Sequence, residues 1–208
     1  MQADLSTPHP TSLGSGRKRP KPGERRLQIL QAIAAMLQED ASEKVTTAAL
    51  AARLSLSEAA LYRHFASKAQ MYEGLLDFVE ETIFGLINQI EAQPIKAMAK
   101  SREIVLMLLN FAEKNPGMTR VLIGDAIVNE DSRLQARVNQ LIDRVEASLR
   151  QCLRLHGAED GRGPENDAPA RAHVVMAYVQ GAWLQFAKSG FRKQPSSAAD
   201  GAVKILLG

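Results

Sequence analysis

Apolar residues recur every three to four positions along most of the chain, which is the period of an α-helix with one buried face. Near the start, for example, Leu27, Leu30 and Ala34 share one such face. No stretch shows the period of two that a half-buried strand requires. The expected fold class is therefore all-α. The pattern predicts helices over residues 24–38, 46–53, 57–65, 67–93, 96–114, 119–128, 132–156 and 171–189, and a weak last helix through Leu207.

Three hydroxyl side chains mark the starts of predicted helices. Thr46, Ser57 and Ser67 each stand where a side-chain oxygen can accept the free N–H groups of a first helical turn. Gln70 follows Ser67 by three residues, as in a capping box. The helices opened by Thr46 and Ser57 are short and lie three residues apart, which is typical of a helix-turn-helix. The leucines expected to pack these two helices together and against the first helix are Leu50, Leu54, Leu56 and Leu61.

The net charge of the chain is concentrated at its N-terminus. The 208 residues carry a formal net charge of +3. The first 23 residues account for all of it, with Arg17, Lys18, Arg19 and Lys21 against Asp4. Because this segment is rich in Pro, Gly, Ser and Thr, we expect residues 1–23 to form a disordered basic arm. The arm is either a solubilising tail or an extension that reaches the phosphates or a groove of a duplex.

Composition restricts the classes of function. Hydrophobic residues make up 45% of the chain, enough for a sizeable core. The single cysteine, Cys152, excludes an internal disulfide and a CxxC site, and its apolar stripe makes it a core residue. His156 and His173 lack a second ligand at helical spacing, and no phosphate loop, HExxH or nucleophile elbow is present. The sequence therefore predicts no enzyme, no metal and no cofactor.

No apolar run approaches the length of a membrane span or of a signal peptide, so we expect a cytoplasmic protein without a membrane partner. Beyond the arm, the predicted organisation is a helix-turn-helix domain over residues 24–68 and a larger helical domain over 69–208. The polar stretch 157–169, with its Gly and Pro residues, is expected to be a flexible excursion within the larger domain.

The second short helix carries the candidate DNA-reading residues. In a helix-turn-helix this helix enters the major groove, while the first lies across the phosphate backbone. Tyr62, His64 and Lys68 can donate to phosphate oxygens, and Arg63 can read a guanine edge or bind phosphate. Small side chains such as Ala59 allow close approach to the bases. The DNA-binding residues predicted on this helix and directly after it are Ser57, Glu58, Ala59, Tyr62, Arg63, His64 and Lys68.

Four sequence blocks carry a resemblance to a known family. TTxxLA from residue 46 and LSEAALYRHFxSK from residue 56 closely resemble the DNA-binding domain of tetracycline-repressor-type regulators. NPGxTRxLxG from residue 115 and RLQxRxNQL from residue 133 resemble the nucleoid occlusion factors within that family. The resemblance implies a homodimer on palindromic chromosomal sites, associated with the nucleoid in the cytoplasm. It adds Thr46 and Thr47, at the start of the first short helix, to the expected DNA-binding residues. It also implies spreading as paired dimers and inhibition of the assembly of the tubulin-like division GTPase.

The same resemblance implies a groove between two long helices for the C-terminal tail of that division protein. Phe78 and Asn115 fit the family pattern, and Lys114 stands where the family can have arginine, which keeps the charge but loses the bidentate fork. Asn110 replaces an expected glycine in that groove, and Leu86 replaces an expected arginine. On spacing alone Phe78 would be a core residue, so burial and exposure in the groove both stay open.

Two smaller departures from the family pattern fall in the DNA-binding domain. Ser55 occupies a turn position where glycine is usual, which costs about 1 kcal/mol if the backbone there has positive φ. Ala66 replaces a proline, which loosens the start of the next helix.

The competing function is a ligand-released repressor with the same DNA-binding domain. It would need a closed pocket lined by the helices over 75–111 and 119–128. In either case, binding to a palindrome requires two copies of the DNA-binding domain. We therefore expect a dimer interface, the dimer seam, made by the helices over 134–153 and 174–186. Gly181 and Ala182 would allow close approach there.

Overall fold

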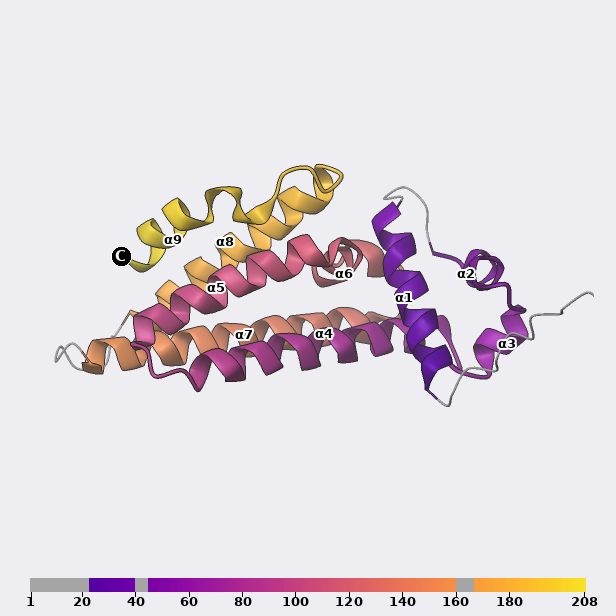
Figure 1. Cartoon of the computed structure of the whole chain (residues 1–208), viewed down its shortest axis with the longest axis horizontal. Helices are drawn as coiled ribbons and strands as arrows, with labels where there is room; N and C mark the ends of the chain where they lie inside the picture. The colour runs from indigo at the N-terminus through magenta and orange to yellow at the C-terminus, as the bar shows by residue number, and fades with distance from the viewer. Residues whose placement is uncertain (1–22, 40–44, 160–166) are drawn as a thin grey trace, which may run out of the picture.

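The computed structural model describes residues 23–39, 45–159 and 167–208, and every regular element in these ranges is helical. The predicted break at 40–43 and nearly all of the basic arm lie outside the described residues. The all-α prediction is confirmed. Figure 1 shows an elongated molecule with α1, α2 and α3 gathered at one end. The elements are α1 (Glu24–Glu39), α2 (Thr47–Leu54), α3 (Glu58–Tyr62), α4 (Lys68–Glu91), α5 (Ala97–Lys114), α6 (Pro116–Leu122), η1 (Asp125–Ile127), α7 (Ser132–Glu159), α8 (Ala168–Lys188), η2 (Pro195–Ala198) and α9 (Ala199–Leu207).

Three side-chain caps begin the helices at this end of the molecule. The hydroxyl oxygens of Thr46, Ser57 and Ser67 accept the backbone N–H three residues further on, at 3.1, 3.2 and 3.1 Å. The three helix starts predicted from the sequence are therefore confirmed. The expected capping box differs in one detail, because the Gln70 side chain accepts the N–H of Ala66 at 2.9 Å instead of that of the cap residue itself.

The recognition helix α3 is shorter than predicted. It ends at Tyr62 instead of residue 65, because the N–H groups of both His64 and Phe65 bond back to the carbonyl of Leu61 and the chain turns inward. Phe65 consequently lies in the core, 1% exposed. Leu50 and Leu61 are buried as expected. Leu54 and Leu56 also pack against the core, but they are only half-buried because they flank the surface turn between α2 and α3.

A left-handed residue forms the turn between α2 and α3. Ser55 has φ 53° and ψ 46°, a region that side chains other than glycine enter only at an energetic cost. This conformation closes α2, because the N–H of Ser55 bonds to the carbonyl of Ala52 and the N–H of Leu56 to that of Ala51. The positive φ on which the predicted penalty depended is therefore present.

A close backbone contact fixes α1 against α6. Gly117 lies so near that a Cβ added to it would stand 2.0 Å from the carbonyl oxygen of Ala34. Three residues on, Arg120 is 6% exposed, and its guanidinium donates to the carbonyl of Leu37 at 3.1 Å and to the carboxylate of Asp125 at 2.7 Å. The end of α1 is thereby attached to the body of the molecule by both shape and hydrogen bonding.

The body is built from α4, α5, α7 and α8. The long helix α7 packs against each of the other three. Trp183 is fully buried between them, and its indole N–H donates to the carbonyl of Leu108 at 3.1 Å. Cys152 lies in the same core, 3% exposed, as its apolar stripe predicted. The centre of the body is filled by Leu108, Val145, Val179 and Trp183, all at 0% exposure.

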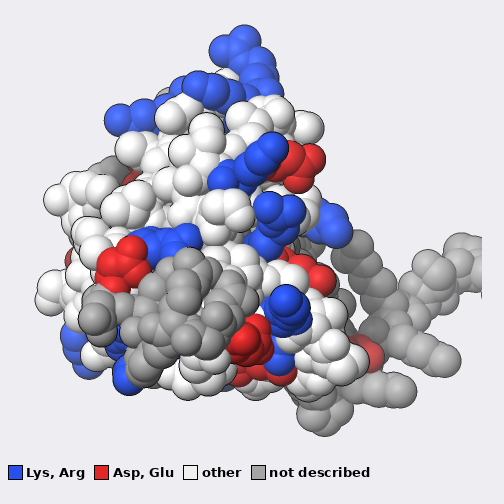
Figure 2. Space-filling model, turned by 90° about the vertical axis from the view of Figure 1, so that its left-hand side faces the viewer, with Lys and Arg blue, Asp and Glu red and all other residues white. Residues whose placement is uncertain are grey.

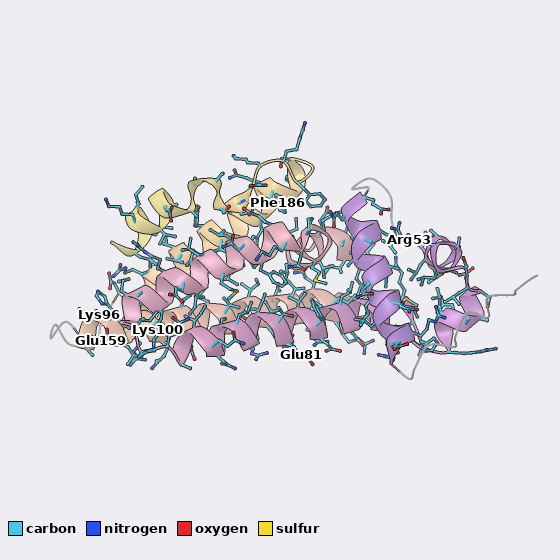
Figure 3. The ribbon with its side chains drawn as sticks, viewed as in Figure 1. Arg53, Glu81, Lys96, Lys100, Glu159 and Phe186 are labelled. Carbon is cyan, nitrogen blue, oxygen red and sulfur yellow. The ribbon has the colours of Figure 1, made fainter. Side chains whose placement is uncertain are left out.

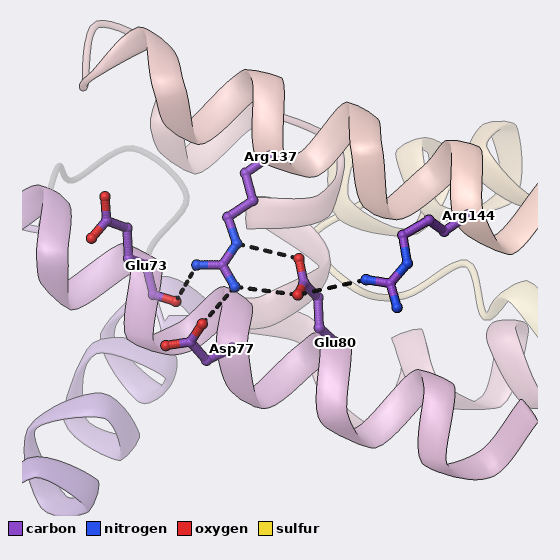
Figure 4. Close-up of polar contacts among 5 residues, drawn as sticks. All are labelled: Glu73, Asp77, Glu80, Arg137 and Arg144. Atoms are coloured by element: carbon purple, nitrogen blue, oxygen red, sulfur yellow. Dashed lines mark hydrogen bonds and ion pairs between the residues drawn. The ribbon is translucent and has the colours of Figure 1, made fainter. Parts of the chain in front are cut away.

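Charged side chains join α4 to α7 on the surface (Figure 4). Arg137 of α7 bonds to Asp77 at 2.5 Å and to Glu80 at 3.2 Å, both on α4, and also donates to the carbonyl of Glu73. Arg144, two turns further along α7, lies 3.9 Å from Glu80. Because one guanidinium binds three groups spread over two turns of α4, the two helices are held in register.

Other helix boundaries also differ from the sequence-based expectation. The helix expected over 119–128 begins earlier, at Pro116, whose fixed φ suits a first helical position. It ends at Leu122, and the chain then turns at Gly124, where φ is 83°, before the short 3₁₀ helix η1.

A further difference concerns the polar stretch expected over residues 157–169. The helix α7 continues to Glu159, and α8 already begins at Ala168. Glu159 stabilises the far end of the molecule, because its carboxylate accepts the N–H of Ala97 at the start of α5 at 3.0 Å. Figure 3 labels it beside Lys96 and Lys100 at that end. The carboxylate therefore replaces the missing side-chain cap of α5.

Replacing Gly117 by Ala is expected to lower the free energy of unfolding by about 1–3 kcal/mol, since the new methyl group meets a backbone carbonyl that cannot rotate away. Thermal or urea unfolding of the purified protein measures the change. The control is Gly85→Ala in α4, where an added Cβ meets nothing within 4 Å. That variant should be more stable by about 0.5–1 kcal/mol, and equal behaviour of the two variants would contradict the close contact.

Replacing Ser55 by Gly is expected to stabilise the protein by about 1 kcal/mol, because glycine adopts the left-handed conformation without steric cost. The same unfolding measurement applies. Ser55→Ala serves as the control, since it removes the hydroxyl but keeps the Cβ, and it should give no gain. A stabilising Ala variant would show that the hydroxyl, and not the backbone conformation, is unfavourable at this turn.

Candidate nucleic-acid interface and partner groove

The predicted DNA-binding residues lie on one end of the molecule, around α2 and α3. Tyr62 is 45% exposed on α3, while His64 and Lys68 are half-buried on either side of the turn that follows it. Small exposed side chains cover the start of α3, so its approach to another surface is sterically open. Thr46, Ser57, Glu58, Ala59, Tyr62 and Arg63 are exposed, and Thr47 is half-buried.

A hydrogen bond between side chains joins the two short helices. The hydroxyl of Thr47 in α2 donates to the carboxylate of Glu58 in α3 at 2.6 Å. Both residues were predicted as separate DNA contacts. The structure shows that they also bond to each other, so the carboxylate at the start of α3 has a defined orientation.

An ion pair fastens α2 to the end of α1. Arg53 bonds to both carboxylate oxygens of Glu39, at 2.5 and 2.6 Å, and Figure 3 labels it beside α2. The hydrogen bond from Arg53 lowers the pKa of Glu39. The sequence pattern gave no signal for this pair, because the two residues belong to different predicted helices.

Arg26 is a structural neighbour of the DNA-binding residues that the sequence did not indicate. Its guanidinium lies 4.0 Å from the centre of the Phe65 ring and donates to the carbonyl of His64. Cation–π stacking of this kind holds an exposed arginine in place. The first turn of α1 therefore supports the turn that carries His64.

Lys68 is not free in this structure. At the first position of α4, its ammonium lies 2.5 Å from the carboxylate of Glu130, in the segment between η1 and α7. The same ammonium is 5.7 Å from the centre of the Tyr72 ring. The sequence predicted this lysine as a phosphate contact, and its pairing across 62 residues could not be read from any local pattern.

A groove of about 280 Å³ lies between α1, α4 and the α5–α6 corner. Phe78 lines it and is 42% exposed. Of the two possibilities left open by the sequence, burial in the core or exposure in the groove, the structure shows exposure. Lys114 and Asn115 also line the groove, but Asn110 is exposed elsewhere on α5 and is not among the lining residues. The residues that line the groove are Leu27, Leu30, Gln31, Ala34, Ala35, Gln38, Leu75, Phe78, Lys114, Asn115, Gly117 and Met118.

The groove differs in one respect from the expected cleft between two long helices. Half of its lining residues belong to α1, the helix that packs against α2 and supports the turn after α3. Leu27 illustrates the point, since the apolar pattern placed it on a buried face but it is 49% exposed at the rim of the groove.

The helices expected to form a dimer seam leave apolar groups uncovered. On α8, Val174 is 53% and Leu184 40% exposed. Gly181 lies half-buried on the same helix, and a Cβ added there would meet nothing within 4 Å, while Ala182 is also half-buried. A second helix could therefore approach α8 closely at these positions.

Within the described residues, no group of three or more His, Cys, Asp and Glu side chains is arranged to hold a metal ion. In the same ranges, none of the helices is both long and apolar enough to cross a membrane. Burial raises the pKa of the Cys152 thiol, which disfavours the nucleophilic thiolate form.

Comparison with known proteins assigns both parts of the chain to families. Residues 29–75 match the model of bacterial regulatory proteins of the tetR family, and residues 95–207 match the tetracyclin repressor-like C-terminal domain named SlmA-like. The chain is 44% identical over 176 residues to the nucleoid occlusion factor SlmA of Alteromonas mediterranea, covering 85% of this chain and 90% of that protein. It is also 44% identical over 177 residues to SlmA of Escherichia coli O1:K1, covering 85% and 89%.

Solved structures show the same fold at low sequence identity. The regulator MbdR from Azoarcus sp. CIB is 18% identical with a TM-score of 0.72, covering 88% of this chain and 96% of that chain. FadR from Bacillus subtilis, solved in complex with stearoyl-CoA, is 13% identical with a TM-score of 0.69, covering 88% and 97%. The family models and the curated relatives together confirm the resemblance carried by the sequence blocks: the chain belongs to the nucleoid occlusion factors of the tetR family.

Proposed function

We propose that two copies of the chain bind palindromic chromosomal DNA through α2 and α3. While bound, they inhibit assembly of the tubulin-like division GTPase, because they hold its C-terminal tail in the groove beside α1. The observation that carries this proposal is that α1 packs against α2, the helix that holds α3, and also forms one wall of the groove lined by Phe78. One end of the molecule thus offers both surfaces.

Placed groups, not bulk charge, supply the affinity for DNA in this proposal. Beyond the first 23 residues the chain has as many acidic as basic residues. Figure 2 shows the end of the molecule away from α3, where basic side chains lie in several places with acidic and uncharged ones between them. Tyr62, the last residue of α3, and Arg63, which follows it, are the exposed groups that we assign to the DNA backbone and the base edges.

Dimerisation doubles these contacts and matches the symmetry of a palindrome. We assign the seam to the outer faces of α7 and α8, where Val174 and Leu184 are exposed and Gly181 is open to close approach. The predicted division of the chain at residue 68 and the paired dimers on DNA remain part of the proposal. The basic arm, outside the described residues, would add a salt-sensitive contribution.

The chemistry of the groove suits an extended tail with an apolar side chain and a carboxylate. Phe78, Leu75 and Leu27 offer apolar surface, and Lys114 adds a positive charge at the same site. Asn110, outside the lining, contributes only if the tail continues along α5. Leu86, which replaces the expected arginine, removes one positive charge from α4.

The alternative, a ligand-released repressor, would need a closed pocket for its ligand between the helices over 75–111 and 119–128. FadR, which shares the fold, was solved in complex with one small molecule, stearoyl-CoA. The inward-facing side chains of α4, α5 and α6, among them Leu76, Leu108 and Leu122, are instead buried in the hydrophobic core. This packing supports the reading in which a macromolecular partner occupies the surface groove.

Tyr62→Phe is expected to weaken binding to all duplexes by about three- to tenfold, since it removes one hydrogen bond to a phosphate, which carries no base information. Fluorescence anisotropy with a selected palindrome and an unrelated duplex measures this. The control is Ser197→Ala on η2, which removes an exposed hydroxyl outside α2, α3 and the proposed seam and should change nothing. If only the palindrome were affected, Tyr62 would be a base reader.

Phe78→Ala is expected to weaken docking of a synthetic peptide with the sequence of the division protein's C-terminal tail by about tenfold or more, while DNA affinity stays unchanged. Titration of the labelled peptide, with and without palindromic DNA, gives both values. Ile205→Ala is the matched control, because Ile205 is 84% exposed on α9 and away from the groove. Unchanged peptide affinity in Phe78→Ala would exclude this groove as the docking site.

A further inference from the structure

Lys68 and Glu130 form the ion pair that connects the first residue of α4 with the segment between η1 and α7. Their side chains are 26% and 20% exposed, and the two charged atoms are 2.5 Å apart. Because the pair is partly shielded from water, it is screened by salt less than a fully exposed pair would be. It therefore holds Lys68 in one place in the DNA-free protein.

The surroundings of the pair explain why Glu130 is suited to this lysine. An ammonium at a helix N-terminus is disfavoured by the helix dipole, and a nearby carboxylate compensates for it. Beneath the pair lies Tyr72, which is 2% exposed. Burial and the charge of Glu130 together raise the pKa of Tyr72 to about 12. The carboxylate thus lies against a buried neutral ring, with Lys68 as its cationic partner.

We propose that Glu130 sets the DNA affinity of the protein by competing with the DNA backbone for Lys68. The proposal rests on the DNA binding proposed above. A phosphate offers the same chemistry as the carboxylate, an anion that accepts hydrogen bonds from the ammonium at the start of α4. Each binding event therefore exchanges one anion for another at Lys68, and the free energy of the internal pair is subtracted from that of the new contact.

The exchange also releases the segment that carries Glu130. This segment follows directly on α6 and η1, whose Arg120 and Asp125 hold the end of α1 at Leu37. In the DNA-free protein the stretch from α6 to Glu130 therefore bonds to the DNA-binding end at Leu37 and at Lys68, beside the close backbone contact of Gly117 with Ala34. The contact at Leu37 is a buried hydrogen bond, whereas the contact at Lys68 is the one that a phosphate can replace.

The test compares the DNA affinities of Glu130→Gln and Asp131→Asn in the full-length protein. Asp131→Asn is the matched control, because it removes the same charge one residue away. Asp131 pairs with Arg133 instead of Lys68. We expect Glu130→Gln to bind DNA about two- to fivefold more tightly than wild type, the range that corresponds to a partly exposed ion pair. Asp131→Asn should show only the small general effect of one negative charge fewer.

A double-mutant cycle with Lys68→Gln identifies the partner. In the Lys68→Gln background, Glu130→Gln should no longer raise DNA affinity, because no competition remains. Glu130→Asp is a second variant that keeps the charge but shortens the side chain, and it too should raise affinity if contact with Lys68 matters. This variant answers the question even if Glu130→Gln proves unstable in a melting experiment.

Two results would overturn the proposal: equal affinities of Glu130→Gln and Asp131→Asn, or an effect of Glu130→Gln that persists without Lys68. Either result would leave the proposed DNA binding intact. If the wild-type protein failed to bind any duplex, by contrast, the proposed function itself would be wrong, and the two failures are therefore distinguishable.

Discussion

The contact between α1 and α6 is the constraint on which the rest of the molecule depends. Gly117 allows the two backbones to meet, and Arg120 carries its charge into the interface, where Leu37 and Asp125 accept its hydrogen bonds. A buried arginine is tolerated only when its donors are satisfied in this way. Because α1 is attached here, this contact sets the position of α2 and α3 relative to the long helices in the DNA-free protein, and with it the position of one wall of the groove.

Local patterns in the sequence predicted the helices and their starts, since caps and amphipathic spacing act within a few residues. Thr46 and Ser57 behave as the sequence indicated, and the cost at Ser55 was foreseen from the family pattern. Helix ends were less predictable: α7 runs on to Glu159 because that carboxylate meets the start of α5, a contact between distant segments. A periodic pattern holds no information about which segments will become neighbours.

In the candidate site, too, local features were predictable from the sequence and contacts between distant segments were not. Sequence blocks indicated which residues face DNA, and the structure exposes most of them, but the partners of those residues come from elsewhere in the chain. Arg26 supports the turn at His64 from α1, and Glu130 binds Lys68 from the other side of the body. Such pairings depend on the packing of the whole molecule, so a motif identifies the residues of a site before it can identify what holds them.

The walls of the groove belong to two different helices, and this has a thermodynamic consequence. One wall, including Leu27, belongs to α1, and the opposite wall, including Phe78, belongs to α4. A ligand shifts a conformational equilibrium only by as much as its affinity differs between the two states. An occupant that touches both walls senses the angle between them, so any tilt of α1 that DNA favours changes the affinity of the occupant by some factor. By linkage the occupant must change the affinity for DNA by the same factor.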